Sequence, residues 1–213
     1  MSQGLAKKRK MLSQLTFQHN SFANCEFQPW KNKQGKTREL GRDSKEAFSW
    51  RLSSAVIEKD CEFSSFQNYE RIICILSGGG VELSHPNRPV KNLELLCPYR
   101  FSGETGTIAK ISAPCTDLNL FILKGEAKGN MFPMSLKEFE EYQLPISAAE
   151  HFVICIEGEI ELVERQESKK FELKPFDFVR VTRTEKQEFP NLKVLSKKNP
   201  SKVIWVPIHL LND

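Results

Sequence analysis

The chain has 213 residues, which is enough for one large or two small β domains with a buried core. Hydrophobic residues make up 39% and charged residues 27%, as in ordinary soluble proteins, and no apolar run is long enough for a membrane-spanning helix. The net charge of +4 comes from one cluster, Lys7 to Lys10, and the neutral remainder has no basic face that would indicate nucleic-acid binding.

Residues 1–14 are predicted to be a flexible basic leader. Its charge cluster would also be compatible with a localisation signal or a membrane-surface patch, but a solvated terminus needs no further assumption. Because no continuous apolar stretch follows the cluster, the leader does not resemble a secretory signal. We therefore expect a cytoplasmic protein.

The segment 29–40, PWKNKQGKTREL, is polar and contains Gly35, so it is predicted to be a loop that runs into a strand. Its second residue is Trp30, which is unusual for a solvated turn. The segment is therefore either a surface turn whose Trp packs on the protein, or one wall of a binding site.

Short runs rich in β-branched and aromatic residues, separated by Gly, Pro, Asn or Ser, predict strands through most of the chain. They occupy 48–57, 71–76, 107–112, 117–123, 152–164, 169–181 and 202–211. One short helix is predicted at 134–144, where Ser135 and Glu138 have capping-box spacing and apolar residues recur at helical intervals.

Two regions about eighty residues apart share a pattern of a glycine-turned hairpin followed by a strand that enters a Pro-aromatic corner. The first begins at Ile73 and the second at Ile154. Such a repeat predicts two β-barrels of one type. The corner at Leu173-x-Pro175-x-Asp177 resembles that of the cupins, so the predicted fold is a bicupin, two RmlC-like jelly-roll barrels at 15–130 and 131–213.

Most cupins bind a metal through closely spaced His residues and a Glu. The four His residues here are widely separated and the six Cys residues form no CxxC pair, so we expect no metal and no other cofactor. Glu157, Glu159 and Glu161 alternate along a strand, which a solvated strand face explains better than a metal or acid–base site.

Several short motifs follow one another along the chain: Pro29-Trp30-Lys31-Asn32, Thr37-Arg38-Glu39, Ser49-Trp50-Arg51-Leu52-Ser53, Phe63-Ser64-Ser65-Phe66, Glu70-Arg71, Pro98-Tyr99-Arg100-Phe101 and Thr116-Asp117-Leu118-Asn119. In this order they resemble the motifs of the HutD/Ves family. The resemblance implies a metal-free bicupin with a pocket in the N-terminal barrel. It also implies a link to histidine utilisation, with N-formylglutamate as a ligand proposed for the family. The chain departs from the family where Lys33 and Gln34 replace two glycines of a triplet, and where Glu62 replaces a proline.

Arg51 is the leading candidate for the binding residue. Alternation places Trp50 and Leu52 on one face of the strand and Arg51, with Ser49 and Ser53, on the other. That second face is either solvated or the polar interior of a barrel. The family resemblance favours the interior, where a guanidinium is a fixed fork for a carboxylate.

Other candidates have structural alternatives. Trp30 and Phe101 would form apolar walls, although both could simply be core residues, as could Phe66. Glu70 and Arg71 could form an edge ion pair, and Asp117 could cap a turn. The complete predicted ligand-binding set is Trp30, Asn32, Thr37, Glu39, Arg51, Ser53, Phe66, Arg71, Phe101, Asp117 and Asn119.

The leading interpretation is a non-enzymatic protein that binds a small carboxylate metabolite, in regulation or buffering of histidine utilisation. The alternative is a metal-free isomerase or amide hydrolase, whose general base would be Glu39, Glu70 or Asp117. A purely structural or protein-interaction role is a third option. No nucleic-acid or membrane partner is expected, and a homodimer is left open because cupins often dimerise through their sheets.

Overall fold

The computed structural model describes residues 15–30, 35–43, 46–164, 168–183 and 191–211. In these ranges the chain forms β-strands joined by turns, with one turn of 3₁₀ helix, η1 (Phe22–Asn24). The all-β prediction is therefore confirmed. The predicted leader lies outside the described residues.

The N-terminal half contains two sheets that face each other. The N-terminal large sheet comprises, in spatial order, β2 (Phe27–Pro29), β3 (Gly35–Arg42), β4 (Trp50–Ile57), β11 (Cys115–Leu123), β6 (Tyr69–Gly78) and β9 (Tyr99–Ser102). The N-terminal small sheet comprises β5 (Cys61–Phe63), β10 (Thr107–Ile111), β7 (Val81–Ser84) and β8 (Lys91–Leu93). Buried apolar residues from both sheets form one core between them.

The C-terminal half repeats this arrangement. The C-terminal large sheet comprises β1 (Leu15–Ser21), β18 (Asp177–Arg183), β15 (Glu150–Glu157), β20 (Ser201–Leu210) and β12 (Ala127–Gly129), with β13 (Phe132–Leu136) also paired to β20. The C-terminal small sheet comprises β14 (Glu141–Pro145), β19 (Asn191–Ser196), β16 (Ile160–Glu164) and β17 (Lys169–Leu173). The two small sheets have the same strand order, which supports the duplication read from the sequence.

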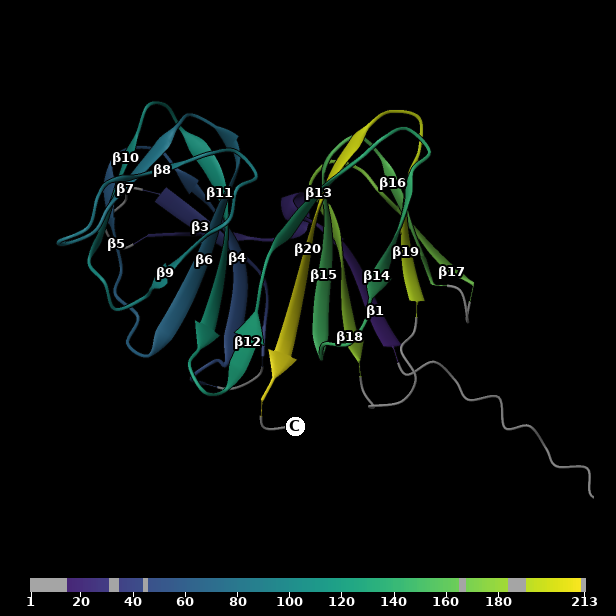
Figure 1. Ribbon diagram of the computed structural model, residues 1–213, viewed down its shortest axis with the longest axis horizontal. Helices are drawn as coiled ribbons and strands as arrows, with labels where there is room; N and C mark the ends of the chain where they lie inside the picture. Colours follow the sequence, from purple (N-terminus) through teal and green to yellow (C-terminus); the bar gives the residue numbers. More distant parts are fainter. Residues whose placement is uncertain (1–14, 31–34, 44–45, 165–167, 184–190, 212–213) are drawn as a thin grey trace, which may run out of the picture.

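The first strand does not belong to the half in which the sequence placed it. All seven residues of β1 pair with β18, so the segment assigned to the N-terminal barrel completes the C-terminal large sheet (Figure 1). The reason is packing at long range: Leu15 enters the C-terminal core, and the Phe17 ring stacks on Phe171 at 5.3 Å. The boundary predicted at 130/131 therefore does not separate the sheets.

The helix predicted at 134–144 is wrong. The segment forms β13 and β14, joined by a turn in which the Glu140 carboxylate accepts the Lys137 N–H at 2.7 Å. Thus Glu140, and not the predicted capping residue Glu138, makes the acidic side-chain contact, and it closes a turn. Leu136 and Leu144 are both buried in the C-terminal core, whereas Phe139, which fits the helical spacing, is exposed at the turn with a φ of +59°.

The two large sheets pack against each other across a third core, in the middle of the molecule between the two halves shown in Figure 1. Trp50 and Leu52 enter this core from β4, and Phe152 and Ile154 enter it from β15. Trp50 and Phe152 meet edge to face with ring centres 5.8 Å apart. Since β4 buries its apolar face here, its opposite face is left for the interior of the N-terminal half.

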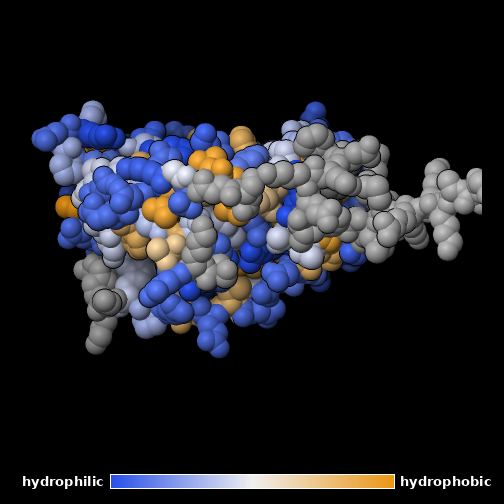
Figure 2. All heavy atoms as spheres, turned by 90° about the horizontal axis from the view of Figure 1, so that it is seen from below, coloured by the Kyte–Doolittle hydropathy of each residue, from blue (hydrophilic) through white to orange (hydrophobic). Residues whose placement is uncertain are grey.

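The outer surface is mostly polar. Figure 2 shows one face on which small groups of hydrophobic residues lie between hydrophilic ones. Exposed large apolar residues come from all four sheets, for example Phe27, Ile108, Phe132 and Tyr142, and so do not mark a single dimer surface. In the part of the chain that the structure describes, no helix has the length and hydropathy to cross a membrane.

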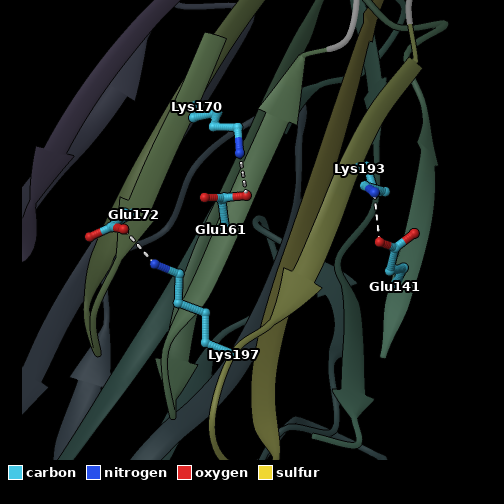
Figure 3. A network of polar contacts seen from close by, with 6 residues as sticks. All are labelled: Glu141, Glu161, Lys170, Glu172, Lys193 and Lys197. Atoms are coloured by element: carbon cyan, nitrogen blue, oxygen red, sulfur yellow. Dashed lines mark hydrogen bonds and ion pairs between the residues drawn. The ribbon is translucent and has the colours of Figure 1, made fainter. Parts of the chain in front are cut away.

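Ion pairs link the strands of the C-terminal small sheet (Figure 3). Glu161 lies 3.3 Å from Lys170, Glu141 lies 2.6 Å from Lys193, and Glu172 pairs with Lys197. In the C-terminal large sheet, Glu157 at the end of β15 pairs with Lys202 of β20 at 2.6 Å. Two of the three glutamates considered for a metal site are therefore held by lysines.

Replacing Glu161 with Gln is expected to change the free energy of unfolding by less than about 1 kcal/mol, because its partner Lys170 is largely exposed. Urea denaturation of the parent and the variant measures this difference. A loss above about 2 kcal/mol would show that the network stabilises the sheet more than surface ion pairs do.

Candidate functional site

A cavity of about 410 Å³ lies in the N-terminal half, on the face of β4 opposite to the central core. Eight of the eleven predicted site residues line it: Trp30, Thr37, Arg51, Ser53, Phe66, Arg71, Asp117 and Asn119. The large sheet supplies most of the lining, and Phe63 from β5 of the small sheet closes the opposite side.

The remaining three predicted residues do not line the cavity. Asn32 lies outside the described residues. Glu39 is exposed on β3, where its carboxylate lies 3.9 Å from Arg42, although its charge still acts on Arg51. Phe101 is buried in the core behind Arg71, whose guanidinium carbon lies 5.0 Å from the ring centre. These two predictions of direct lining are wrong: Glu39 points toward solvent, and Phe101 packs behind a residue that does line the cavity.

Two arginines lie on either side of one phenylalanine in the large sheet. Phe121 on β11 is in register with Arg51 of β4 on one side and with Arg71 of β6 on the other. The guanidinium carbons of Arg51 and Arg71 lie 4.5 Å and 4.6 Å from the centre of the Phe121 ring. Phe121 is not among the predicted site residues, although its i+4 spacing from Asp117 along one strand face is a signal that identifies it.

Arg51 points into the cavity. It is half-buried, and its guanidinium also lies 5.2 Å from the Phe48 ring and 5.7 Å from the Phe66 ring. Desolvation lowers the pKa of Arg51, and the charge of Glu39 opposes that shift. Its Nε is buried and has no hydrogen-bond partner among the described residues. Of the two faces weighed for this strand, Arg51 is therefore on the interior one.

Arg71 is more deeply buried, with 5% of its surface exposed. It forms no edge ion pair with Glu70, which instead binds Arg100 at 2.7 Å on the exposed edge. Its Nη2 donates to Asn119 Oδ1 at 3.1 Å, and its Nε has no partner within the described part of the chain. Burial lowers the pKa of Arg71 to about 10, so the guanidinium is still charged at neutral pH.

Asp117 fixes the orientation of this arrangement. Its Oδ1 accepts the Ala55 N–H at 2.9 Å and its Oδ2 accepts from Asn119 Nδ2 at 2.8 Å, which turns the amide oxygen of Asn119 toward Arg71. Asp117 lies within β11 and caps no turn, so that alternative is excluded. Burial raises the pKa of Asp117 to about 7, while the Ala55 bond and the charge of Arg71 oppose the rise.

The segment beginning at Pro29 forms one wall of the cavity. Trp30 lines it and donates through Nε1 to Thr37 Oγ1 at 2.6 Å. Gly35 lies beneath the indole, where an added Cβ would be 2.8 Å from the Val56 carbonyl oxygen and 3.1 Å from the Trp30 ring. The absence of a side chain at Gly35 thus allows the indole to approach β3 and β4 closely.

The site therefore presents two cationic groups and a set of fixed polar groups, surrounded by aromatic rings. Such a surface suits a small anion with an apolar part. The cysteines near Asp117 are not nucleophiles at neutral pH, because burial raises the thiol pKa of Cys61 to about 11 and those of Cys74 and Cys115 to about 12. Among the described residues no three His, Cys, Asp or Glu are grouped to hold a metal ion.

A family model described as HutD matches residues 23–197. A 21.2 kDa protein from the hutC 3′ region of Pseudomonas putida is 42% identical over 96 residues, which cover 43% of this chain and 50% of that protein. The match to this relative thus spans about half its length.

Two solved structures extend the likeness over 92% of the chain, both at 22% identity. One is a conserved protein of unknown function from Pseudomonas aeruginosa PAO1, and the alignment includes 100% of that protein with a TM-score of 0.83. The other is HutD from Pseudomonas fluorescens SBW25, in a formate condition, and the alignment includes 99% of that protein with a TM-score of 0.76. A cupin 2 barrel protein from Leptotrichia buccalis, 13% identical with a TM-score of 0.57 over 82% of this chain and 88% of that one, shares the fold type.

Proposed function

Because the chain belongs to the HutD family, we propose that it binds a small carboxylate metabolite, with N-formylglutamate as the first candidate, in regulation or buffering of histidine utilisation. The single observation that carries this proposal is the position of Arg51. Its guanidinium faces a cavity of about 410 Å³ next to Phe121, with a buried Nε that no described residue satisfies. A carboxylate is the group whose two oxygens match that fork.

Surrounding residues support a ligand with polar and apolar parts. Ser53 and Asn119 are in register on adjacent strands and both line the cavity, next to the Arg51–Phe121 pair. Phe63 and Phe66 supply apolar surface. A carboxylate held at Arg51 would therefore have hydrogen-bonding groups on one side and aromatic rings on the other.

Calorimetric titration with formate, N-formylglutamate, glutamate and urocanate tests the proposal. For the ligand that the parent protein binds most tightly, Arg51→Ala should weaken binding by about ten- to a hundred-fold, as expected for a charge-assisted hydrogen bond worth 1.5–3 kcal/mol. Arg51→Lys should not restore it, because an ammonium group cannot form the bidentate contact.

Arg42→Ala is the matched control, since Arg42 is in register with Arg51 on the neighbouring strand but is exposed and does not line the cavity. Its effect on affinity should stay within about threefold, as for an exposed charge outside the site. Equal affinity in the parent and both Arg51 variants would refute the assignment.

One observation favours an enzymatic alternative. Asp117 is the only one of the three candidate bases that lines the cavity, and its pKa of about 7 is suitable for general base catalysis. Against it, both carboxylate oxygens already accept hydrogen bonds from Ala55 and Asn119. NMR of the ligand after prolonged incubation distinguishes the two functions: an unchanged spectrum supports binding alone, and product that disappears in Asp117→Asn supports catalysis.

A further inference from the structure

Asp117 is a buried carboxylate in the wall of the cavity. It is 1% exposed and lies on β11, the strand between those that carry Arg51 and Arg71. Its two hydrogen-bond donors, the Ala55 N–H and the Asn119 amide, are neutral. Among the described residues no ion pair joins it to either arginine, although the charge of Arg71 acts on it. Burial without a directly bound cation disfavours the ionised form of a carboxyl group.

The hydrogen bonds of Asp117 leave room for a proton. A carboxylate has about four acceptor positions, two on each oxygen. In the described part of the chain, Ala55 occupies one position on Oδ1 and Asn119 one on Oδ2. A proton can therefore be added without loss of either bond, and Asn119 can keep its amide oxygen toward Arg71. Protonation thus changes the charge of the site and preserves its arrangement.

The other titratable groups that face Asp117 keep one charge state above pH 6.5. Arg71 of β6 stays a cation, with a pKa of about 10. His85, which follows β7 and lies 5.4 Å from the Phe101 ring behind Arg71, has its pKa lowered from 6.5 by burial and is uncharged there. The thiols that interact with Asp117 from β5, β6 and β11 are neutral, because burial raises their pKa to about 11 or 12; they are Cys61, Cys74 and Cys115. Glu62 of β5 lines the cavity but is exposed to solvent.

A bound anion and the ionised Asp117 would repel each other. A ligand carboxylate at Arg51 occupies the same cavity that Asp117 lines, where little water separates the two negative charges. A carboxylate that gains a negative neighbour holds its proton more tightly. Because the pKa of Asp117 is already raised to about 7, the proton goes to Asp117 and the ligand stays an anion.

We propose that the cavity binds its anion together with a proton from solvent, which Asp117 takes up as the anion enters. In the complex Asp117 is then a neutral hydrogen-bonding group, while Arg51 and Arg71 keep their charges. Release of the anion returns the proton to solvent. The inference rests on the proposed function and adds control of the same site by pH: the anion binds more tightly as the pH falls toward 6.5.

Calorimetry on the unmodified protein tests the inference without risk to folding. Formate and N-formylglutamate are titrated at pH 7.5 in HEPES and in Tris, whose different enthalpies of ionisation reveal the protons that binding takes up. We expect uptake of at least about half a proton per bound anion, and an affinity that falls at least about fivefold from pH 6.5 to pH 8.5. Binding of either acid with no proton uptake would overturn the inference and leave the proposed function intact. Failure of both acids to bind would instead refute the proposed function.

Asp117→Asn, with Glu62→Gln as the matched control, then locates the proton. Asp117→Asn should abolish proton uptake and hold the affinity within about twofold over the same pH range. Glu62→Gln removes the exposed carboxylate of the cavity and should retain the uptake. Proton uptake that persists in Asp117→Asn would assign it to another group and overturn the inference.

Carbon NMR of the Asp117 carboxyl in the parent gives the same answer without a variant. The midpoint of its titration should move from about pH 7 to above about pH 8 when the cavity is saturated with formate. A midpoint that formate leaves in place would contradict the proposal.

Discussion

Truncation of Phe152 to Ala is expected to lower the free energy of unfolding by about 3–5 kcal/mol. Phe152 is fully buried in the central core, where its ring packs edge to face on Trp50 and lies 6.1 Å from that of Phe178. A Cβ added at Gly41 would lie 2.9 Å from the tip of the Phe152 ring, so β3 also packs closely against this ring. Removal of the ring leaves a cavity between two rigid sheets, which can collapse only in part.

Urea denaturation followed by circular dichroism measures this loss, with Phe139→Ala as the matched control. Phe139 is exposed by 66% in the turn between β13 and β14, so its truncation should change stability by less than about 0.5 kcal/mol. Similar losses in the two variants would show that the central core does not hold the halves together.

Asp117 is expected to make stability depend on pH. Its pKa rises from 3.8 to about 7 on burial. Between these two pH values the folded protein therefore keeps a proton that the unfolded chain has released. This contribution to stability is complete below about pH 4 and is lost as the pH rises through 7, at up to about 1.4 kcal/mol per pH unit. In Asp117→Asn this dependence on pH should be absent. The amide oxygen can accept only one of the two hydrogen bonds that the Ala55 N–H and Asn119 Nδ2 donate to the carboxylate.

The measurement is the difference in unfolding free energy between the parent and Asp117→Asn, from pH 4.5 to pH 8. The difference removes the opposite contribution of His151, whose pKa falls to about 4 on burial and which destabilises the fold as the pH drops below 6.5. Arg71, with a pKa of about 10, does not titrate in this range. A difference that stays constant with pH would mean that Asp117 is already ionised throughout.

The sequence predicts those features of the site that depend on local periodicity. Alternation along β4 separates Trp50 from Arg51, and the structure places the first in the central core and the second in the cavity. The role of Arg71 could not be derived in this way, because an ion pair with Glu70 at the strand edge explained Arg71 as well as ligand binding did. Only the register of β6 between β11 and β9 shows that Glu70 faces outward and Arg71 inward.

Long-range pairing explains the two errors in the fold. β1 is an alternating strand by any local measure, and nothing in its residues indicates that its partner is β18, more than 150 positions away. In 134–144, Leu136, Phe139 and Tyr142 recur every three residues, close to helical spacing, by coincidence, while Met134 and Leu136 also alternate. Pairing of β13 with β20 and of β14 with β19 decides between the two patterns, since backbone hydrogen bonds to existing strands are gained only in the extended form.

A crystal structure of the protein grown with N-formylglutamate tests the central claim most directly. The account predicts a carboxylate in the N-terminal cavity, with both oxygens about 2.7–2.9 Å from guanidinium nitrogens of Arg51 and with the ligand against the Phe121 ring. Ligand bound at another surface, or an Arg51 side chain turned away from a ligand that does occupy the cavity, would contradict it.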